Sequence, residues 1–421
     1  MATDPDDDEL ELIRRSGVVL RVGRLSLSSG TGSYRVKASM ARVARALGID
    51  RHEAQVTLTE ITTTSHRGAS FRTEVTEVRA IGINVDRLAA LEQLAGRLDA
   101  TGRTSVDDVT ESLDRIAAKP PLYPLVLGAV WAAIACAAFS FLTGGGVTEI
   151  VGVFVGAFLG QALRRALVHR GVNPFAVTML CALVACFGYL GFVSLLDATG
   201  ITEVPHQAGY IAAVLFLVPG FPLVTGFLDL AKMDFSAGVA RLTYAVMIVT
   251  SAALAVWALS LVVSLTPHPP APPALDPGPL LALRFVASFV GVLGFALMFN
   301  SPWRIALAAA VIGMLANVPR IWFLGTGAPP QVAAALAALL VGLLTAVVAP
   351  RLDVPRITVY VPAVTIMVPG VLLYQSVFSI SNGDTIDALA AGVEAALVVA
   401  SLAIGLAIAR MLTDRTWAYE R

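Results

Sequence analysis

The sequence carries little charge over most of its length. Only 14% of its 421 residues are charged and 56% are hydrophobic, and 34 of the 60 charged residues lie within residues 1–118. The mean hydropathy of +0.75 is typical of a polytopic helical membrane protein and excludes an ordinary soluble enzyme. We therefore expect a soluble N-terminal domain followed by a membrane-embedded remainder.

Cysteine and histidine are also scarce, with three and five residues. The cysteines fall inside apolar segments without disulfide or zinc spacing, which predicts packing roles for Cys136, Cys181 and Cys186. His52 and His66 do not form a His-Glu-x-x-His motif, and neither a Gly-x-Ser-x-Gly motif nor a phosphate-binding loop is present. The sequence therefore predicts no metal, no cofactor and no enzymatic activity.

The sequence also lacks the signals of a nucleic-acid-binding protein and of a secretory signal peptide. The net charge is zero and no basic run accompanies aromatic residues, so the sequence gives no reason to expect a nucleic-acid partner. Residues 1–9 are acidic and lack an apolar core, which is unlike a secretory signal peptide.

Residues 1–119 have the pattern of a small cytoplasmic α+β domain. Residues 55–64 alternate apolar and polar side chains as a half-buried strand does, and residues 71–79 repeat the pattern after a turn at Arg67-Gly68, which predicts a hairpin. Gly48 is expected to end a helix as a C-cap. The helices are expected at residues 9–29, 34–47, 86–100 and 105–118, before Pro120-Pro121.

Ten apolar segments follow, each close to the roughly 20 residues that a helix needs to cross a bilayer. Seven prolines in residues 266–279 predict a stiff extracytoplasmic linker between two five-helix modules, residues 120–265 and 280–412, and residues 413–421 would form a cytoplasmic tail. The segments are 122–142, 147–168, 174–196, 207–230, 238–264, 280–299, 303–323, 330–349, 357–380 and 386–410.

Lysine and arginine gather at one set of span ends. By the positive-inside rule this set is cytoplasmic, which predicts that both termini are cytoplasmic. Arg284 and Arg320 are exceptions, because they lie near span ends on the opposite side. The cytoplasmic set is Lys119, Arg164, Arg165, Arg170, Lys232, Arg241, Arg304, Arg351, Arg356, Arg410, Arg415 and Arg421.

A Val-Pro-Gly motif occurs in the middle of two spans, at residues 218–220 and 368–370, which are 150 residues apart. Proline lacks a backbone donor, and glycine adopts dihedrals that other residues avoid. An unmade backbone hydrogen bond is costly in lipid, so a broken helix is expected to line a cavity rather than to face lipid. Paired broken helices indicate the binding site of a transporter, although a kink needed for packing is the alternative.

An odd number of spans in each module has a geometric consequence. The second module must enter the membrane in the opposite sense, which predicts two inverted five-helix repeats, ten transmembrane helices in all. The fourth and ninth spans could then bring the two breaks together near the middle of the membrane. Asp234 and Asp384 each lie fourteen residues after their motif glycine, which supports this alignment.

The groups at the breaks are candidate substrate ligands. The half-helix ends at Pro219-Gly220 and Pro369-Gly370 could present amide groups to a carboxylate and carbonyl groups to a cation. Polar side chains just beyond the breaks suit hydrogen bonding to a small ligand, although each is more often a helix-packing group. These side chains are Thr225, Tyr374 and Gln375.

Two acids inside the spans are candidates for proton coupling. Glu394 is the deepest, about two turns into the last span, where a carboxyl could exchange a proton near neutral pH; its alternative role is to hydrogen-bond neighbouring helices together. Asp229 could hold a substrate ammonium, carry a proton, or pair with Lys232 or Arg241. Arg241 lies close enough to the interface to extend its side chain into water.

This ordered set of motifs resembles the threonine/serine exporter family of bacterial inner-membrane proteins, over nearly the whole chain. Thr225 departs from the family pattern, in which an amide side chain is expected. The resemblance rests on Ser29-Gly30-Thr31 with Tyr34-Arg35-Val36, on Ala44 to Gly48, on Val218-Pro219-Gly220 to Leu223 with Asp229, Leu230, Asp234, Ser236 and Gly238, and on Val368-Pro369-Gly370 with Tyr374.

The resemblance implies efflux of small hydroxy amino acids driven by the proton-motive force. We therefore predict a secondary transporter whose partners are threonine or serine, protons and the lipid bilayer. An exporter of small dicarboxylates such as succinate, on the same architecture, is the alternative, because some relatives that are split into two polypeptides are associated with that activity. A channel or membrane-embedded enzyme belongs to a different class and has less support. The sequence leaves a homo-oligomer open.

Overall fold

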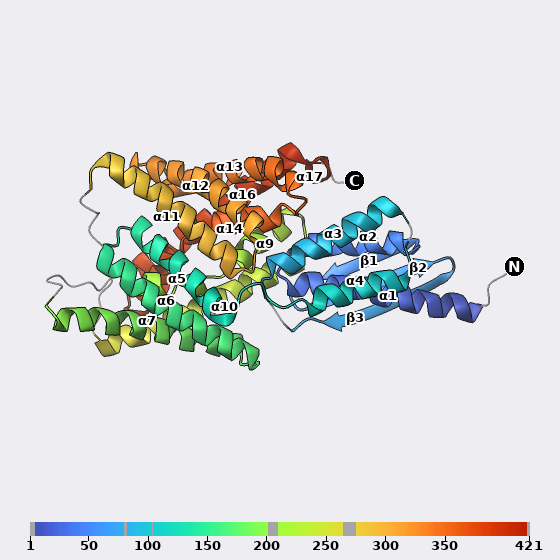
Figure 1. Ribbon diagram of the computed structural model, residues 1–421, viewed down its shortest axis with the longest axis horizontal. Helices are drawn as coiled ribbons and strands as arrows, with labels where there is room; N and C mark the ends of the chain where they lie inside the picture. Colours follow the sequence, from blue (N-terminus) through green and yellow to red (C-terminus); the bar gives the residue numbers. More distant parts are fainter. Residues whose placement is uncertain (1–4, 80–81, 103, 201–208, 264–274, 419–421) are drawn as a thin grey trace. The chain divides into compact units, whose positions relative to one another are not determined.

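The computed structural model describes residues 5–79, 82–102, 104–200, 209–263 and 275–418 (Figure 1). The chain forms two compact units. The first comprises Met1–Leu122, Thr225–Leu242 and Ala349–Thr358, and the second comprises Tyr123–Val224, Thr243–Val348 and Val359–Arg421. The five-part division expected from the sequence remains a prediction, and residues 264–274 of the proline-rich linker lie outside the described residues.

The N-terminal part of the first unit is an α+β fold, as predicted. Four helices pack with a three-stranded antiparallel sheet of order β1-β2-β3 around a core that includes Val19, Val36, Met40, Ile61 and Leu113. The elements are α1 (Pro5–Ser28), α2 (Ser33–Ala46), β1 (Arg51–Val56), β2 (Glu60–Arg67), β3 (Ser70–Glu77), α3 (Val85–Thr101) and α4 (Val106–Ala118).

The sheet corrects one prediction. Residues 55–64 are not a single strand, because β1 ends at Val56 and β2 begins at Glu60. The Thr57 hydroxyl stabilises the turn between them by accepting a hydrogen bond from the Glu60 amide at 3.1 Å. Threonine suits strands and turns alike, so the alternating pattern alone does not reveal the turn. The predicted hairpin at Arg67-Gly68 is confirmed, with Arg67 opposite Ser70 and φ +56° at Gly68.

Local signals explain where the N-terminal helices begin and end. Gly48 follows α2 with φ +72°, a left-handed conformation that glycine adopts at low cost, and the predicted C-cap is confirmed. The side chains of Asn84 and Ser105 accept hydrogen bonds from the amides three residues later, at 3.0 and 3.1 Å. These N-caps fix the starts of α3 and α4.

The described residues contain eight continuous helices that are long and apolar enough to cross a membrane, or ten spans if each of two bent pairs counts as one. The chain is therefore a polytopic helical membrane protein, as predicted. The continuous helices are α5 (Leu125–Leu142), α6 (Val147–His169), α7 (Pro174–Ala198), α10 (Phe235–Val263), α11 (Pro277–Met298), α12 (Trp303–Gly325), α13 (Pro330–Arg351) and α16 (Thr385–Thr413).

Each bent pair contains one Val-Pro-Gly motif. In the first pair, α8 (Gly209–Ala213) and the short 3-10 helix η1 (Leu215–Leu217) precede α9 (Gly220–Ala231). In the second pair, α14 (Ile357–Thr365) precedes α15 (Gly370–Ser381). A short helix, α17 (Arg415–Ala418), follows α16.

Small residues allow close helix packing in the second unit. A methyl group on Gly156 of α6 would lie 2.4 Å from the Ala185 carbonyl oxygen of α7, so only glycine permits this approach. The three cysteines are fully buried with free thiols, which confirms the predicted packing role of Cys136, Cys181 and Cys186.

The two halves of the chain have matching helix lengths after the breaks. Helices α9 and α15 have 12 residues each, α10 and α16 have 29 each, and each pair is offset by 150 residues. The turns before the long helices also match, since the amides of Asp234 and Asp384 donate to the carbonyls of Asp229 and Ser379 at 2.9 Å in both. These matches support the alignment made from the sequence, and the inverted relation of the halves remains a prediction.

Candidate functional site

Both Val-Pro-Gly motifs interrupt their helices. The segments on either side are bent by 57° at the first motif and by 52° at the second. Pro219 and Pro369 immediately precede α9 and α15, where an absent N–H group removes no helical hydrogen bond. The amides of Gly220 and Gly370 bond instead to the valine carbonyl two residues earlier, at 2.8 Å in both motifs.

The two breaks lie against each other within the second unit. A methyl group on Gly370 would lie 2.5 Å from Leu215 Cδ2 and 3.2 Å from Val218 Cγ2, both in the segment before the first break. A methyl group on Gly220 would lie 3.2 Å from Thr365 Cγ2, in the segment before the second break. Each motif glycine therefore faces the residues that lead into the other break, and the predicted meeting of the two breaks is confirmed.

Two tyrosines pack beside this contact. The rings of Tyr210 and Tyr374 meet edge to face with centroids 6.1 Å apart, and Phe378 packs against Tyr374 at 5.9 Å. Tyr210 and Tyr374 are 0% and 5% exposed. The two buried hydroxyls interact with each other, and neither has a further hydrogen-bond partner within the described residues. A buried polar group without a full partner is a candidate contact for a polar ligand.

A small cavity adjoins the breaks. It encloses about 20 Å³, room for about one water molecule, and its walls include Leu215, Val218, Gly370 and Tyr374. Pockets that hold small organic ligands measure roughly 300–1,000 Å³. The conformation described here is therefore closed at the breaks, and a ligand larger than water would enter only after the two broken helices separate.

Asp229 and Arg241 form a buried ion pair in the first unit. Arg241 Nε lies 3.0 Å from Asp229 Oδ2, and the two side chains are 3% and 0% exposed. Arg241 also donates a hydrogen bond to the Thr31 carbonyl at 2.8 Å. The expectation that Arg241 reaches water is therefore wrong, because the segment between α1 and α2 covers its guanidinium group. The ion pair with Arg241, one of the possibilities considered for Asp229, is present.

The N-terminus of α2 approaches the same carboxylate. The backbone amides of Ser33 and Tyr34, in the first turn of α2, face Asp229. A methyl group on Gly32 would lie 2.7 Å from Asp229 Oδ1, so a larger residue at position 32 would push the carboxylate away. The positive end of the α2 dipole thus adds to the charge of Arg241 in stabilising ionised Asp229.

Two further contacts join the N-terminal helices to the connections between spans, all within the first unit. Lys37 of α2 forms an ion pair with Asp234, which lies between α9 and α10. Gln93 of α3 donates a hydrogen bond to the Asp353 carbonyl, between α13 and α14, at 2.9 Å. One connection follows the first broken span and the other precedes the second.

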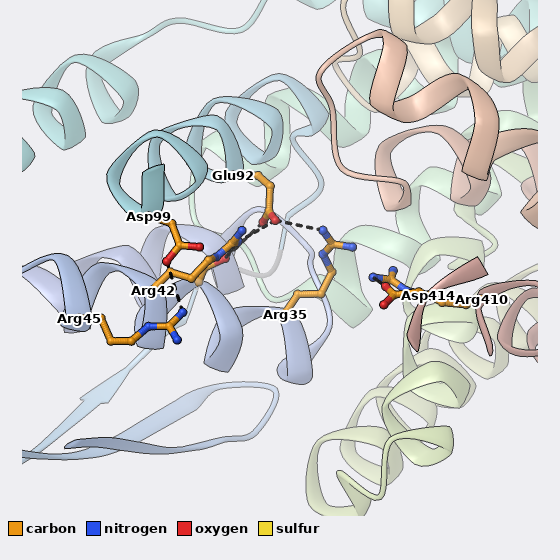
Figure 2. Close-up of polar contacts among 8 residues, drawn as sticks. Arg35, Arg42, Arg45, Glu92, Asp99, Arg410 and Asp414 are labelled. Carbon is orange, nitrogen blue, oxygen red and sulfur yellow. Dashed lines mark hydrogen bonds and ion pairs between the residues drawn. The ribbon is translucent and has the colours of Figure 1, made fainter. Parts of the chain in front are cut away.

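Charged residues also join α2 to α3 (Figure 2). The Glu92 carboxylate accepts from Arg42 at 2.7 Å and lies 3.4 Å from Arg35, and Arg45 pairs with Asp99 at 3.4 Å. This network holds in place the two helices that carry Lys37 and Gln93. Figure 2 also draws Arg410 and Asp414 of the second unit, which form an ion pair at 3.3 Å.

The remaining predicted residues lie on three helices. Thr225 is buried in α9, one turn before Asp229, and Gln375 is half-buried in α15. Glu394 is half-buried in α16, about 14 Å along the helix from its first residue. No hydrogen bond or ion pair to the Glu394 carboxylate occurs among the described residues. The roles of these residues in binding and coupling remain predictions.

Sequence reasoning missed the residues that precede each break. Tyr210, Leu215 and Thr365 contact the opposite half of the site. They lie within apolar runs, and no nearby motif marks these positions as part of a site. If the two breaks face each other, the turn before each break must contact the glycine of the other break. Leu215 and Thr365 could be predicted in this way. The approach of Gly32 to Asp229 joins positions almost 200 residues apart and has no local signal.

Two family models match most of the chain. A family model described as "Putative threonine/serine exporter" matches residues 17–263, and one described as "Threonine/Serine exporter, ThrE" matches residues 284–412. The "Threonine/serine exporter" of Corynebacterium glutamicum is 23% identical over 94% of this chain and 81% of its own length. The "Probable succinate transporter subunit YjjP" of Klebsiella aerogenes is 29% identical over 55% of this chain and 90% of its own length.

A "Probable threonine/serine exporter" from Mycobacterium tuberculosis is 24% identical over 97% of this chain and 78% of its own length. No solved structure matches the chain. These names indicate a transporter rather than an enzyme. Because the first family model alone covers more than half of the sequence, the chain belongs to the threonine/serine exporter family.

Proposed function

We propose that the protein is a secondary transporter that exports threonine and serine in exchange for protons. The observation that carries this proposal is the reciprocal contact between the two broken helices. Helices α9 and α15 both begin at this contact, and helix N-termini favour a carboxylate. Carbonyl groups freed before each proline would accept hydrogen bonds from an ammonium group. A free amino acid carries both charges and would satisfy both sets of groups.

The tyrosine pair would provide contacts for the substrate side chain. Tyr374 lines the cavity and its hydroxyl interacts with that of Tyr210, so a ligand hydroxyl would add a hydrogen bond to this pair. Thr225 and Gln375 each lie five residues after their motif glycine, at equivalent positions of α9 and α15. We assign them, with Pro219, Gly220, Pro369 and Gly370, to the substrate site.

Glu394 is our first candidate for proton coupling. Its carboxylate is half-buried in α16 and has no ion-pair partner among the described residues. Asp229 is the second candidate. A proton bound by Asp229 would compete with its ion pair to Arg241, so proton binding and the pair would be coupled.

The proposal places the protein in a bacterial inner membrane with both termini cytoplasmic and with the halves inverted. The arginine and lysine residues at one set of span ends support this orientation. The matching lengths of α9 with α15 and α10 with α16 support two related halves. The name "subunit" among the relatives is compatible with an oligomer.

Export of a dicarboxylate such as succinate is the second candidate. Relatives from Klebsiella aerogenes and Escherichia coli are named probable succinate transporter subunits, and two facing helix N-termini would also suit two carboxylates. A second carboxylate needs more fixed positive charge than the apolar spans supply, and for this reason amino acids are the first proposal.

Counterflow in proteoliposomes separates these candidates. Labelled threonine, serine and succinate are offered to vesicles that contain the full-length protein, with and without a pH gradient. We expect threonine and serine to exchange, and a pH gradient to drive their net movement. Movement of succinate without movement of threonine or serine would contradict the substrate assignment. Net transport that does not change with the pH gradient would contradict proton coupling.

The role of Glu394 is tested in the same vesicles. We expect Glu394→Gln to abolish the effect of the pH gradient while exchange without a gradient persists. Asp387→Asn is the matched control, because Asp387 is exposed on the same helix two turns earlier. If Glu394→Gln retains gradient-driven transport, the coupling residue lies elsewhere.

A further inference from the structure

Arg320 is a charged residue that the proposed transport site does not use. It lies five residues before the end of α12, about 7.5 Å from that end, on the side of the membrane where the sequence has few cations. Among the described residues, no acid forms an ion pair with it. A guanidinium group this close to a span end reaches the headgroup level of a bilayer, where an anion can neutralise it.

Two polar side chains hold Arg320 in position. Arg320 Nε donates a hydrogen bond to Asn317 Oδ1 at 3.1 Å, and Asn317 Nδ2 donates to Ser288 Oγ on α11 at 3.0 Å. Asn317 and Ser288 are 1% and 0% exposed. This buried chain leaves the two terminal amino groups of the guanidinium to bind another group, in the forked geometry that fits a phosphate.

Arg320 is one of the residues that line a cavity of about 240 Å³ between α12 and α13. Apart from Arg320, its walls are entirely apolar or aromatic, and three of these side chains, Trp322, Leu336 and Leu340, are 66%, 52% and 37% exposed. Exposed apolar side chains on membrane helices face acyl chains. The other wall residues are Ala316, Pro319, Phe323, Ala333 and Ala337.

We propose that this cavity binds an anionic phospholipid, with the phosphate on Arg320 and an acyl chain along the apolar wall of α12 and α13. Charge complementarity and the exposed apolar rim both favour this occupant. A soluble dicarboxylate would have to displace lipid from that rim, and an amino acid would find no acceptor for its ammonium group among the side chains that line the cavity. A tryptophan and an arginine near a span end also suit the headgroup level of a bilayer.

Native mass spectrometry of the full-length protein tests the proposal. The protein is delipidated and titrated with phosphatidylglycerol or with phosphatidylcholine of the same acyl chains. We expect about tenfold stronger retention of phosphatidylglycerol, a ratio that corresponds to about 1.4 kcal/mol. Arg320→Gln should abolish this preference. Arg284→Gln, which removes another arginine from the same side of the membrane, should leave it unchanged.

Leu336→Trp provides a second test that keeps the guanidinium, because a larger side chain at the rim would block the acyl chain. We expect this variant to lose bound phosphatidylglycerol as well, so the proposal stays testable if Arg320→Gln fails to fold. Excess inorganic phosphate and succinate should not displace the lipid. An unchanged lipid preference in a folded Arg320→Gln variant, unchanged retention of phosphatidylglycerol in Leu336→Trp, or displacement by either soluble anion would overturn the proposal.

Discussion

Asp229 and Arg241 depend on each other, because neither charge has water around it. Removing one member of a buried ion pair leaves the other charge uncompensated and typically costs about 3–5 kcal/mol. The Thr31 carbonyl and the α2 amides partly satisfy the two groups, but they cannot replace a full opposite charge. The pair therefore contributes to the stability of the first unit whatever its role in transport.

We expect Asp229→Asn to lower the thermal unfolding temperature of the detergent-solubilised protein, with a loss of about 3–5 kcal/mol in the free energy of unfolding. The double variant Asp229→Leu with Arg241→Met should recover most of this loss, since apolar residues of similar volume need no partner. Equal stability of Asp229→Asn and the unchanged protein would show that the pair contributes little.

Glu92 makes the stability of the first unit depend on pH. Burial would raise the pKa of its carboxyl, but the charges of Arg35 and Arg42 outweigh burial and hold the pKa below the ordinary 4.5. A carboxyl with a lowered pKa binds fewer protons in the folded protein than in the unfolded one. It therefore stabilises the fold above pH 4.5, and this contribution is lost as the pH falls through the lowered pKa.

Hydrogen–deuterium exchange of the full-length protein should show this loss as faster exchange in α2 and α3 in acid, after correction for the intrinsic rate. Glu92→Gln should raise the exchange of both helices at neutral pH and make it less dependent on acid. Glu111→Gln is the control, because Glu111 is 74% exposed and, within the described part of the chain, pairs only with Arg115 at 3.7 Å. If the exchange of α2 and α3 still rises steeply in acid in the Glu92→Gln variant, a different titratable group causes the response.

At the scale of the element, the close contact between the two broken helices depends most on the glycine of the second motif. A methyl group on Gly370 would lie 2.5 Å from Leu215 Cδ2, closer than carbon atoms can approach. Overpacking of this kind costs about 1–3 kcal/mol unless a neighbour moves. The obstructing atom is at the end of a flexible side chain, so a smaller residue at position 215 would restore the space.

We expect Gly370→Ala to slow threonine counterflow by about fivefold or more, as a cost of about 1 kcal/mol implies. Adding Leu215→Ala should restore much of the rate, because the two substitutions share one contact. Gly191→Ala in α7 is the control, since a methyl group there meets no atom within 4 Å. Additive losses in the double variant would mean that the glycine acts through its backbone freedom and not through this contact.

The same elements show how far the sequence predicts the fold. Span positions and the two breaks follow from apolar length and from Pro219 and Pro369, because these signals are local. The turn after Val56 was missed because threonine fits both strand and turn. The contact of Tyr210 with Tyr374 and the cover over Arg241 arise from tertiary packing between distant segments, for which a single sequence carries no direct signal.

At the scale of the molecule, the N-terminal domain contacts the connections next to both broken spans. Lys37 binds Asp234 after α9, and Gln93 binds the Asp353 carbonyl before α14. Both contacts lie within the first unit and join positions about 200 residues or more apart, so the sequence alone does not reveal them.

Inverted halves make a prediction about the whole chain. The connection after α6 and the connection after α12 occupy the same place in their halves, offset by 156 residues, so inversion puts them on opposite sides of the membrane. The native cysteines are fully buried and should react slowly with polar thiol reagents, which keeps the background low. Val172→Cys and Thr326→Cys place one reporter in each connection, and both native side chains are exposed.

In intact cells we expect a membrane-impermeant maleimide to label Thr326→Cys, and to label Val172→Cys only after permeabilisation. Thr143→Cys, before α6, should label from outside and shows that the reagent reaches the first half. Labelling of the two matched connections from the same side would mean that the halves enter the membrane in the same sense. The two broken helices would then meet with parallel polarity, and the pairing of two opposed helix N-termini around one carboxylate would have to be abandoned.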